Sequence, residues 1–259
     1  NGDFQINQRL FAGGALAAGA YGFDRWKGGA SGASCSVSGM IVTLTSGSLT
    51  QVIEVAQRGH ATLAAQTVTV SVDALSGGNL TVTLGSQTGT ITAGSGRRST
   101  TLTLEVGDTG NIALTLAPVS AAVTFSRVRA ELGRHASAWL APSRDIELSA
   151  CQRYYWRVGG VAFNPIGIGR FASTTQGEVY LQLPTEMRTI PTVSTNGVAN
   201  FSFNGVVLTG LTLHAGFNQR RDFVGLLSTV GSAAGTPGDM AVLVSQPAPA
   251  GIIEFSAEL

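Results

Sequence analysis

The groups that could carry out catalysis in this chain are few and do not converge. Three histidines, His60, His135 and His214, have none of the spacings that a metal site requires. No glycine-framed serine of the nucleophile-elbow type marks a Ser-His-Asp site. A glycoside hydrolase needs two convergent carboxylates, and no pair stands out among the 15 acidic residues. The sequence therefore predicts no catalytic residues and no metal ligands, and we expect no enzyme.

Aromatic side chains offer a second kind of chemistry, the binding of sugars. A pyranose ring stacks on an indole or phenol ring while short polar side chains bind its hydroxyl groups. The chain has only 3 tryptophans, and each of them could instead serve the packing of a core or of a domain interface. The candidate stacking residues are Tyr21, Phe23 and Trp26 near the start of the chain, and Trp139 and Trp156 further along.

One stretch, ELSACQRYYWRV at 147–158, differs from the Gly-, Ser- and Thr-rich sequence around it. Ser143 is expected to cap a short helix just before it. Leu148, Cys151 and Tyr155 follow at i, i+3 and i+7, which places them on one helix face, and the aromatic residues after them favour a strand. We interpret the stretch as one or two helical turns that lead into a second domain. Its expected domain-interface residues are Leu148, Cys151, Tyr154 and Tyr155.

Composition excludes several classes of protein. Charged residues make up 12% of the 259 residues and the formal net charge is +1, so the chain lacks the basic stripe of a nucleic-acid-binding protein. No run of about 18 apolar residues occurs, so no membrane insertion is expected. The two cysteines, Cys35 and Cys151, are too few for a disulfide scaffold and are expected to be buried thiols.

Short alternating segments account for most of the first half of the chain. Val68, Val70 and Val72 share one face of a strand, and Thr and Ser residues share the other. Strands at a spacing of about 8–12 residues without intervening helices indicate an antiparallel β-sandwich. Further strands are expected at 40–45, 51–55, 80–84, 102–106, 112–116 and 123–130, with a turn at 28–32 and hairpin connections at 76–79 and 105–111.

A second series of short strands follows the crowded stretch and predicts another sandwich. Alternation stops between 133 and 142, and we expect a domain at 1–133, a linker with a short helix at 134–150, and a second domain at 151–259. The fold class is therefore all-β, with two antiparallel, jelly-roll-like β-sandwich domains. The strands of the second domain are expected at 179–183, 192–194, 201–203, 206–208, 211–217, 223–227, 241–245 and 252–255.

Several short motifs resemble the C-terminal regions of phage and prophage tail-fibre or minor structural proteins. In that family a segment of the type E-x-G-x-x-A leads into E-L-x-x-C-Q-R-Y-Y. The opening NGDF, the DRW at 24–26 and the final IIEFSAEL also fit, in the right order over the whole chain. The residues that match the junction are Glu131, Gly133, Ala136, Glu147, Leu148, Cys151, Gln152, Arg153, Tyr154 and Tyr155.

The resemblance implies a first domain similar to a carbohydrate-binding-module jelly roll, and a smaller sandwich after it. It also implies a location on the virion surface, in a tail fibre or head spike, with other virion proteins as partners and a homo-oligomeric, trimeric assembly. Such jelly rolls often hold a structural calcium. Here Gln5 stands where an acidic residue is usual, and Asp3 and Asp24 alone do not supply the six or more oxygens that the ion prefers, so we expect no cofactor.

The leading hypothesis is therefore a virion-surface protein that attaches to a host cell-surface polysaccharide. The alternative is a structural decoration protein of a capsid or fibre that binds no sugar, and a depolymerase is a third, weaker one. Binding to host polysaccharide without release of reducing ends would distinguish the first from the other two.

Overall fold

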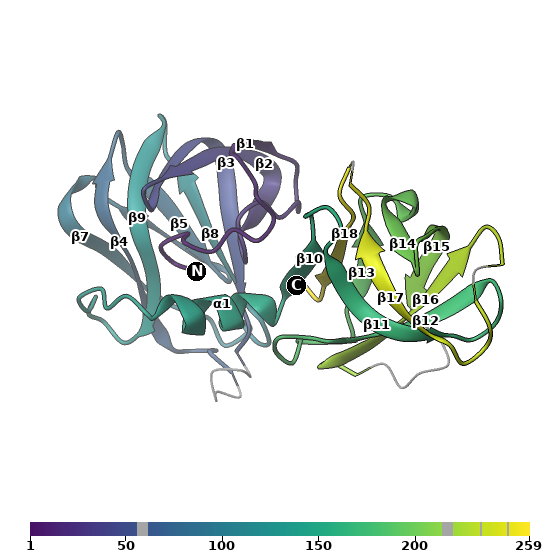
Figure 1. The fold of residues 1–259 in the computed structure, drawn as a ribbon. Coiled ribbons are helices and arrows are strands. Elements are labelled where there is room, and N and C mark those ends of the chain that lie inside the picture. Colours follow the sequence, from purple (N-terminus) through teal and green to yellow (C-terminus); the bar gives the residue numbers. More distant parts are fainter. Residues whose placement is uncertain (56–61, 214–219, 234, 248) are drawn as a thin grey trace. The chain divides into compact units, whose positions relative to one another are not determined.

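The computed structural model describes residues 1–55, 62–213, 220–233, 235–247 and 249–259 (Figure 1). Antiparallel strands make up most of the described residues, so the predicted all-β class is confirmed. The chain divides into two compact units, Asn1–Glu147 and Leu148–Leu259, here called unit 1 and unit 2. No helix in the described ranges is both long enough and apolar enough to cross a membrane.

Unit 1 contains one antiparallel sheet whose strands follow the order β6-β5-β8-β3-β9-β4-β7, with β2 added beside β3 and β1 beside β2. Its strands are β1 (Gly14–Leu16), β2 (Lys27–Ser38), β3 (Ile41–Ile53), β4 (Thr67–Ser76), β5 (Leu80–Leu84), β6 (Gln87–Ile91), β7 (Gly94–Thr103), β8 (Ile112–Pro118) and β9 (Val123–Leu132).

Strand β3 joins the two halves of this sheet. Its beginning, Val42 to Leu44, pairs with β9, whereas its end, Leu49 to Ile53, pairs with β8. The two ends of the strand order also meet, because Gly89 of β6 lies so close to Thr100 of β7 that a Cβ atom at Gly89 would come within 2.7 Å of the threonine hydroxyl. The sheet therefore curls around a core, as a jelly-roll-like sandwich does.

The alternating residues of unit 1 form this core as expected. Val68, Val70 and Val72 are all buried, as are the alternating apolar residues of β5 and β8. The same pattern fails at the end of β7, where the strand stops at Thr103 and Val106 is 77% exposed.

Three local predictions for unit 1 were wrong. The segments at 40–45 and 51–55 overlap the two ends of the single strand β3, which continues through Gly47, at a φ of 70°, with register shifts on either side in place of a turn. The glycine-rich segment 28–32 lies inside β2 and is no turn. Neither 76–79 nor 105–111 connects a hairpin, because β4 does not pair with β5, nor β7 with β8.

Unit 2 begins within α1 (Arg144–Gln152), the helix predicted before the crowded stretch. The Ser143 hydroxyl caps it by accepting a hydrogen bond from the Ile146 amide at 3.4 Å. A three-stranded sheet follows the order β10-β18-β13. Its strands are β10 (Tyr155–Gly159), β13 (Thr192–Thr195) and β18 (Ile252–Ser256), and a short 3-10 helix, η2 (Val198–Asn200), precedes β14.

The other six strands of unit 2 form a closed barrel, where a second sandwich was expected. The barrel closes because β17 pairs with both β11 and β14, which leaves no free end in the ladder. Glycines allow the backbone of the barrel strands to lie close to buried aromatic rings. A Cβ atom at Gly177 of β12 would lie 2.2 Å from the buried Phe203 ring. The barrel strands are β11 (Pro165–Phe171), β12 (Gln176–Gln182), β14 (Phe201–Phe203), β15 (Val206–Leu213), β16 (Phe223–Val230) and β17 (Met240–Ser245).

Most strands predicted for this half are present, but β11 was not predicted, and the segments 206–208 and 211–217 were predicted as two strands. The described part of these two segments belongs to the single strand β15. The remainder, with His214, lies outside the described residues, as does His60.

Candidate functional site

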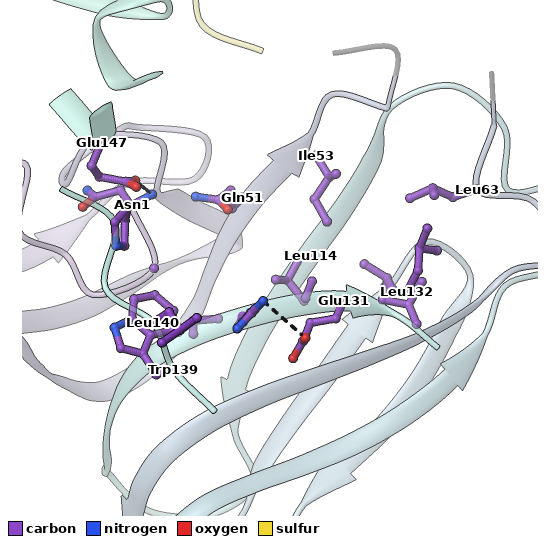
Figure 2. Close-up of a pocket in the computed structure, with 17 residues that line it drawn as sticks. Asn1, Gln51, Ile53, Leu63, Leu114, Glu131, Leu132, Trp139, Leu140 and Glu147 are labelled. Carbon is purple, nitrogen blue, oxygen red and sulfur yellow. Dashed lines mark ion pairs between the residues drawn. The ribbon is translucent and has the colours of Figure 1, made fainter. Parts of the chain in front are cut away.

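A cleft opens in unit 1 where β3 and β9 separate. The two strands pair only over Val42 to Leu44 and Val123 to Phe125. Beyond this point β9 continues beside β4, while β3 continues beside β8. The interior of the sandwich is therefore accessible between them, as a cavity of about 620 Å³ (Figure 2).

A bulge in β9 contributes to this separation. Arg127 adopts a φ of 54°, in a region that residues with a side chain seldom occupy, and the register of β9 against β4 shifts beside it. The Arg127 guanidinium lies 3.2 Å from the Asp73 carboxylate, which is also 2.7 Å from Arg97. After the bulge, Val128 is buried and Arg129 and Glu131 lie on the opposite face of the strand.

Most of the residues that line the walls of the cleft are apolar. On one side Gln51 and Ile53 share the inward face of β3, and Gln51 pairs across the sheet with Leu114 of β8. On the other side Val68 of β4 and Val128 of β9 line the cavity. The Gln51 amide can both donate and accept hydrogen bonds between these apolar surfaces.

Hydrogen bonds hold the segment after β9 at the mouth of the cleft. The Ser137 amide and hydroxyl donate to the two oxygens of Glu131, at 2.9 and 2.6 Å. The Arg129 guanidinium donates to the carbonyl oxygen of Ala138 at 3.0 Å. These contacts place the next residue, Trp139, at the cleft, where Figure 2 shows it beside Leu140.

The Trp139 ring is half-buried and packs closely against the backbone. A Cβ atom at Gly2 would lie 3.0 Å from the ring and 2.1 Å from the carbonyl oxygen of Val128, so the backbone of β9 leaves no room for a side chain at position 2. The Arg97 guanidinium lies 5.8 Å from the ring centre. Trp139 therefore has a fixed position in which part of its surface contacts the cleft.

Charge at the mouth of the cleft is arranged around Glu131. Burial raises the pKa of this carboxyl, but the hydrogen bonds from Ser137 and the positive charges of Arg129 and Arg97 outweigh burial, so its pKa lies below the ordinary value. Glu131 is therefore ionised at neutral pH and accepts hydrogen bonds only, while Arg129, at 3.4 Å from it, donates them. The mouth thus combines an aromatic ring with fixed donors and acceptors.

Trp26 was a candidate glycan-binding residue, and the structure corrects this expectation. Its side chain is 1% exposed, and its ring stacks on Phe4 with a centroid distance of 5.0 Å. The indole nitrogen donates to the carbonyl oxygen of Asn1 at 2.9 Å. Trp26, like the buried Phe23, belongs to the core and offers no face to a sugar.

The remaining aromatic candidates are not among the residues that line the cleft. Tyr21 is half-buried in unit 1, where Arg9 and Lys27 lie 5.1 and 5.5 Å from its ring centre. Trp156 is half-buried in unit 2 and stacks on Phe255 at 5.2 Å. Of the five candidate stacking residues, Trp139 is the one that lines the cleft.

The four expected domain-interface residues have defined places within unit 2. Cys151, Tyr154 and Tyr155 are buried and Leu148 is half-buried. The Tyr155 hydroxyl donates to Glu254 of β18 at 2.6 Å, and the Ala257 amide donates to the carbonyl oxygen of Tyr154 at 2.8 Å. The stretch is thus attached to the last strand of its own unit, and its role between the domains stays a prediction.

The buried carboxylates near the chain start do not form a calcium site. The Gln5 amide donates to Asp3 at 2.5 Å, and the Gln8 backbone and side chain donate to Asp24 at 2.5 and 2.8 Å. N–H groups directed at both carboxylates do not fit the cage of oxygens that calcium requires. Within the described residues, no cluster of three or more His, Cys, Asp or Glu side chains could hold a metal.

Sequence reasoning did not find Gln51 and Arg129 as residues of the cleft, and it named Glu131 only for its place in a family motif. A signal does exist for two of them: Arg129 and Glu131 are two positions apart in a strand, so opposite charges share one face. Gln51 carries no such signal, because its position depends on which strands lie beside β3.

No protein-family model matches this chain, and no match is found among curated proteins. The fold and the cleft therefore identify only a general class of protein: an all-β protein whose first unit has a cleft lined in part by a tryptophan.

Proposed function

We propose that this chain is an attachment protein on the surface of a phage-like virion, and that unit 1 binds a host cell-surface polysaccharide in its cleft. The observation that supports this function is the meeting of Trp139, Gln51, Arg129 and Glu131 around one cavity of about 620 Å³. Such a cleft is large enough for small ligands. The indole can stack on a sugar ring while the three polar side chains bind its hydroxyl groups.

The experiment compares two aromatic substitutions in unit 1 on a panel of bacterial surface polysaccharides. Trp139→Ala is expected to abolish binding while the chain stays folded, because the ring is only half-buried and is not part of the core of unit 1. Tyr21→Ala is the matched control, because Tyr21 is also half-buried but does not line the cleft. The proposal fails if the wild-type chain binds no polysaccharide, or if Tyr21→Ala loses binding as Trp139→Ala does.

A second function, assembly into a fibre or capsid without sugar binding, is favoured by the outer surface of the barrel. Ile168 of β11 lies directly opposite Val242 of β17, and their side chains are 60% and 37% exposed. Met240, also on β17, is exposed as well, and so is Val207 of β15, the strand on the other side of β14. Exposed apolar surface of this kind marks protein–protein contacts.

This surface fits the homotrimer expected from the family resemblance. Light scattering of the wild-type chain is expected to show an oligomer at micromolar concentration, and Ile168→Asp is expected to shift it to monomer. A stable wild-type monomer would count against self-assembly through this surface.

A further inference from the structure

A second cleft, in unit 2, is lined mainly by charged residues. Three arginines, Arg188, Arg220 and Arg221, and two carboxylates, Glu186 and Asp222, surround a volume of about 570 Å³. Three positive and two negative side chains leave the lining with a net charge of +1. The cleft of unit 1 contributes no residue to it.

Arg188 carries the charge that no carboxylate balances. Its Nε donates to the carbonyl oxygen of Ala257 at 2.9 Å and its Nη2 to that of Glu258 at 3.3 Å. Among the residues that the structure describes, no carboxylate forms an ion pair with it. The guanidinium is therefore held in place by neutral carbonyl groups, and Arg188 also lines the cleft.

The other two arginines form ion pairs that water reaches easily. Arg220 lies 3.1 Å from Asp222, and the two side chains are 69% and 38% exposed. Arg221 pairs with Glu186 in an equally open position, at 49% and 54% exposed. Exposed pairs of this kind stabilise a fold little, so an incoming anion can compete with the carboxylates for the guanidinium groups.

We propose that this cleft binds a singly charged oxyanion, the carboxylate or sulfate group that acidic saccharides carry. Guanidinium groups present N–H donors in a planar fork that matches such oxyanions, and one negative charge neutralises the excess charge of the cleft. The exposed Thr189 offers a hydroxyl donor at the edge of the cleft. Ile190, which is 48% exposed, offers an apolar contact for the body of the ligand.

The test is a titration of the full chain with sodium glucuronate, and in parallel with glucose, at constant ionic strength. Arginine Nε–H signals in NMR spectra are expected to shift for Arg188, Arg220 and Arg221 with glucuronate and to stay in place with glucose. Sodium sulfate is expected to displace glucuronate from the same residues. Arg220→Gln and Arg221→Gln should each weaken glucuronate binding about tenfold, because each removes a charge-assisted hydrogen-bond donor.

Arg170→Gln is the matched control. Arg170 also forms an exposed ion pair in unit 2, 3.0 Å from Glu178, but it does not line the cleft. This variant changes the net charge by the same amount and is expected to bind glucuronate like the wild type. Equal weakening by all three variants, or no arginine shift with glucuronate, would overturn the proposal. Neither result depends on Trp139, so the unit 1 proposal is tested separately.

Discussion

At the scale of single residues, burial distinguishes Trp26 from Tyr21, two of the aromatic side chains near the start of the chain. Trp26 is in the core of unit 1, so Trp26→Ala is expected to lower the free energy of unfolding by about 3–5 kcal/mol. Tyr21 is half-buried beside Arg9 and Lys27, and Tyr21→Ala should cost about 1 kcal/mol or less. Urea unfolding of the two variants measures both values, and a Trp26→Ala variant as stable as wild type would contradict its core position.

Glu131 gives unit 1 a pH dependence of known sign. Because the pKa of Glu131 is lowered in the folded chain, its contribution to stability is complete above its ordinary value of 4.5 and is lost as the pH falls through the lower folded value. Glu131→Gln should therefore lose stability relative to wild type at pH 7, and the difference should shrink in acid. Thermal unfolding from pH 7 to pH 3 measures this, and a constant difference would refute it.

The pKa of Cys35 is raised, whereas that of Glu131 is lowered. Burial raises the pKa of its thiol to about 11, so the reactive thiolate is scarce at neutral pH. Both cysteines are buried as thiols, as the sequence predicted.

At the scale of elements, β10 and β18 connect the crowded stretch to the end of the chain. Tyr155 is buried in this strand pair, and its hydroxyl bonds Glu254. Tyr155→Ala is expected to destabilise unit 2 by about 3–5 kcal/mol through loss of the ring. Tyr155→Phe keeps the ring and should cost about 1.5 kcal/mol through loss of the hydrogen bond alone. Denaturant unfolding ranks the two, and equal losses would mean that the ring contributes nothing.

The sequence predicts elements well where apolar and polar residues alternate, and poorly where packing requires glycine. Strands β5 and β8 follow from alternation alone. Strand β2 has few β-branched residues, and its glycines are needed because a Cβ atom at Gly28 would lie 2.4 Å from the carbonyl oxygen of Ala17. The cleft was beyond prediction, because it depends on the partners of β3 and on a positive φ at Arg127.

At the scale of the whole molecule, both proposed sites lie in open clefts, and each would contact only a few sugar units. Binding energy for so small a ligand is limited, so one chain should bind weakly. Many copies on one particle raise the effective concentration, and a gain of about 10²–10⁴ in apparent affinity is expected. Surface plasmon resonance at low and high density of the immobilised chain measures the gain. Nanomolar binding by a single chain would contradict the expectation that one chain binds weakly.

The closed barrel of unit 2 affects whether neighbouring copies of the chain can pair with one another through their strands. A sheet with a long open edge offers unpaired N–H and C=O groups to the strands of neighbouring molecules and so promotes fibrous aggregation. Closure leaves the barrel with no such edge, and the strands at the two edges of the small sheet, β10 and β13, have only five and four residues. Crowded copies of unit 2 can therefore contact one another through side chains without polymerising through their backbones.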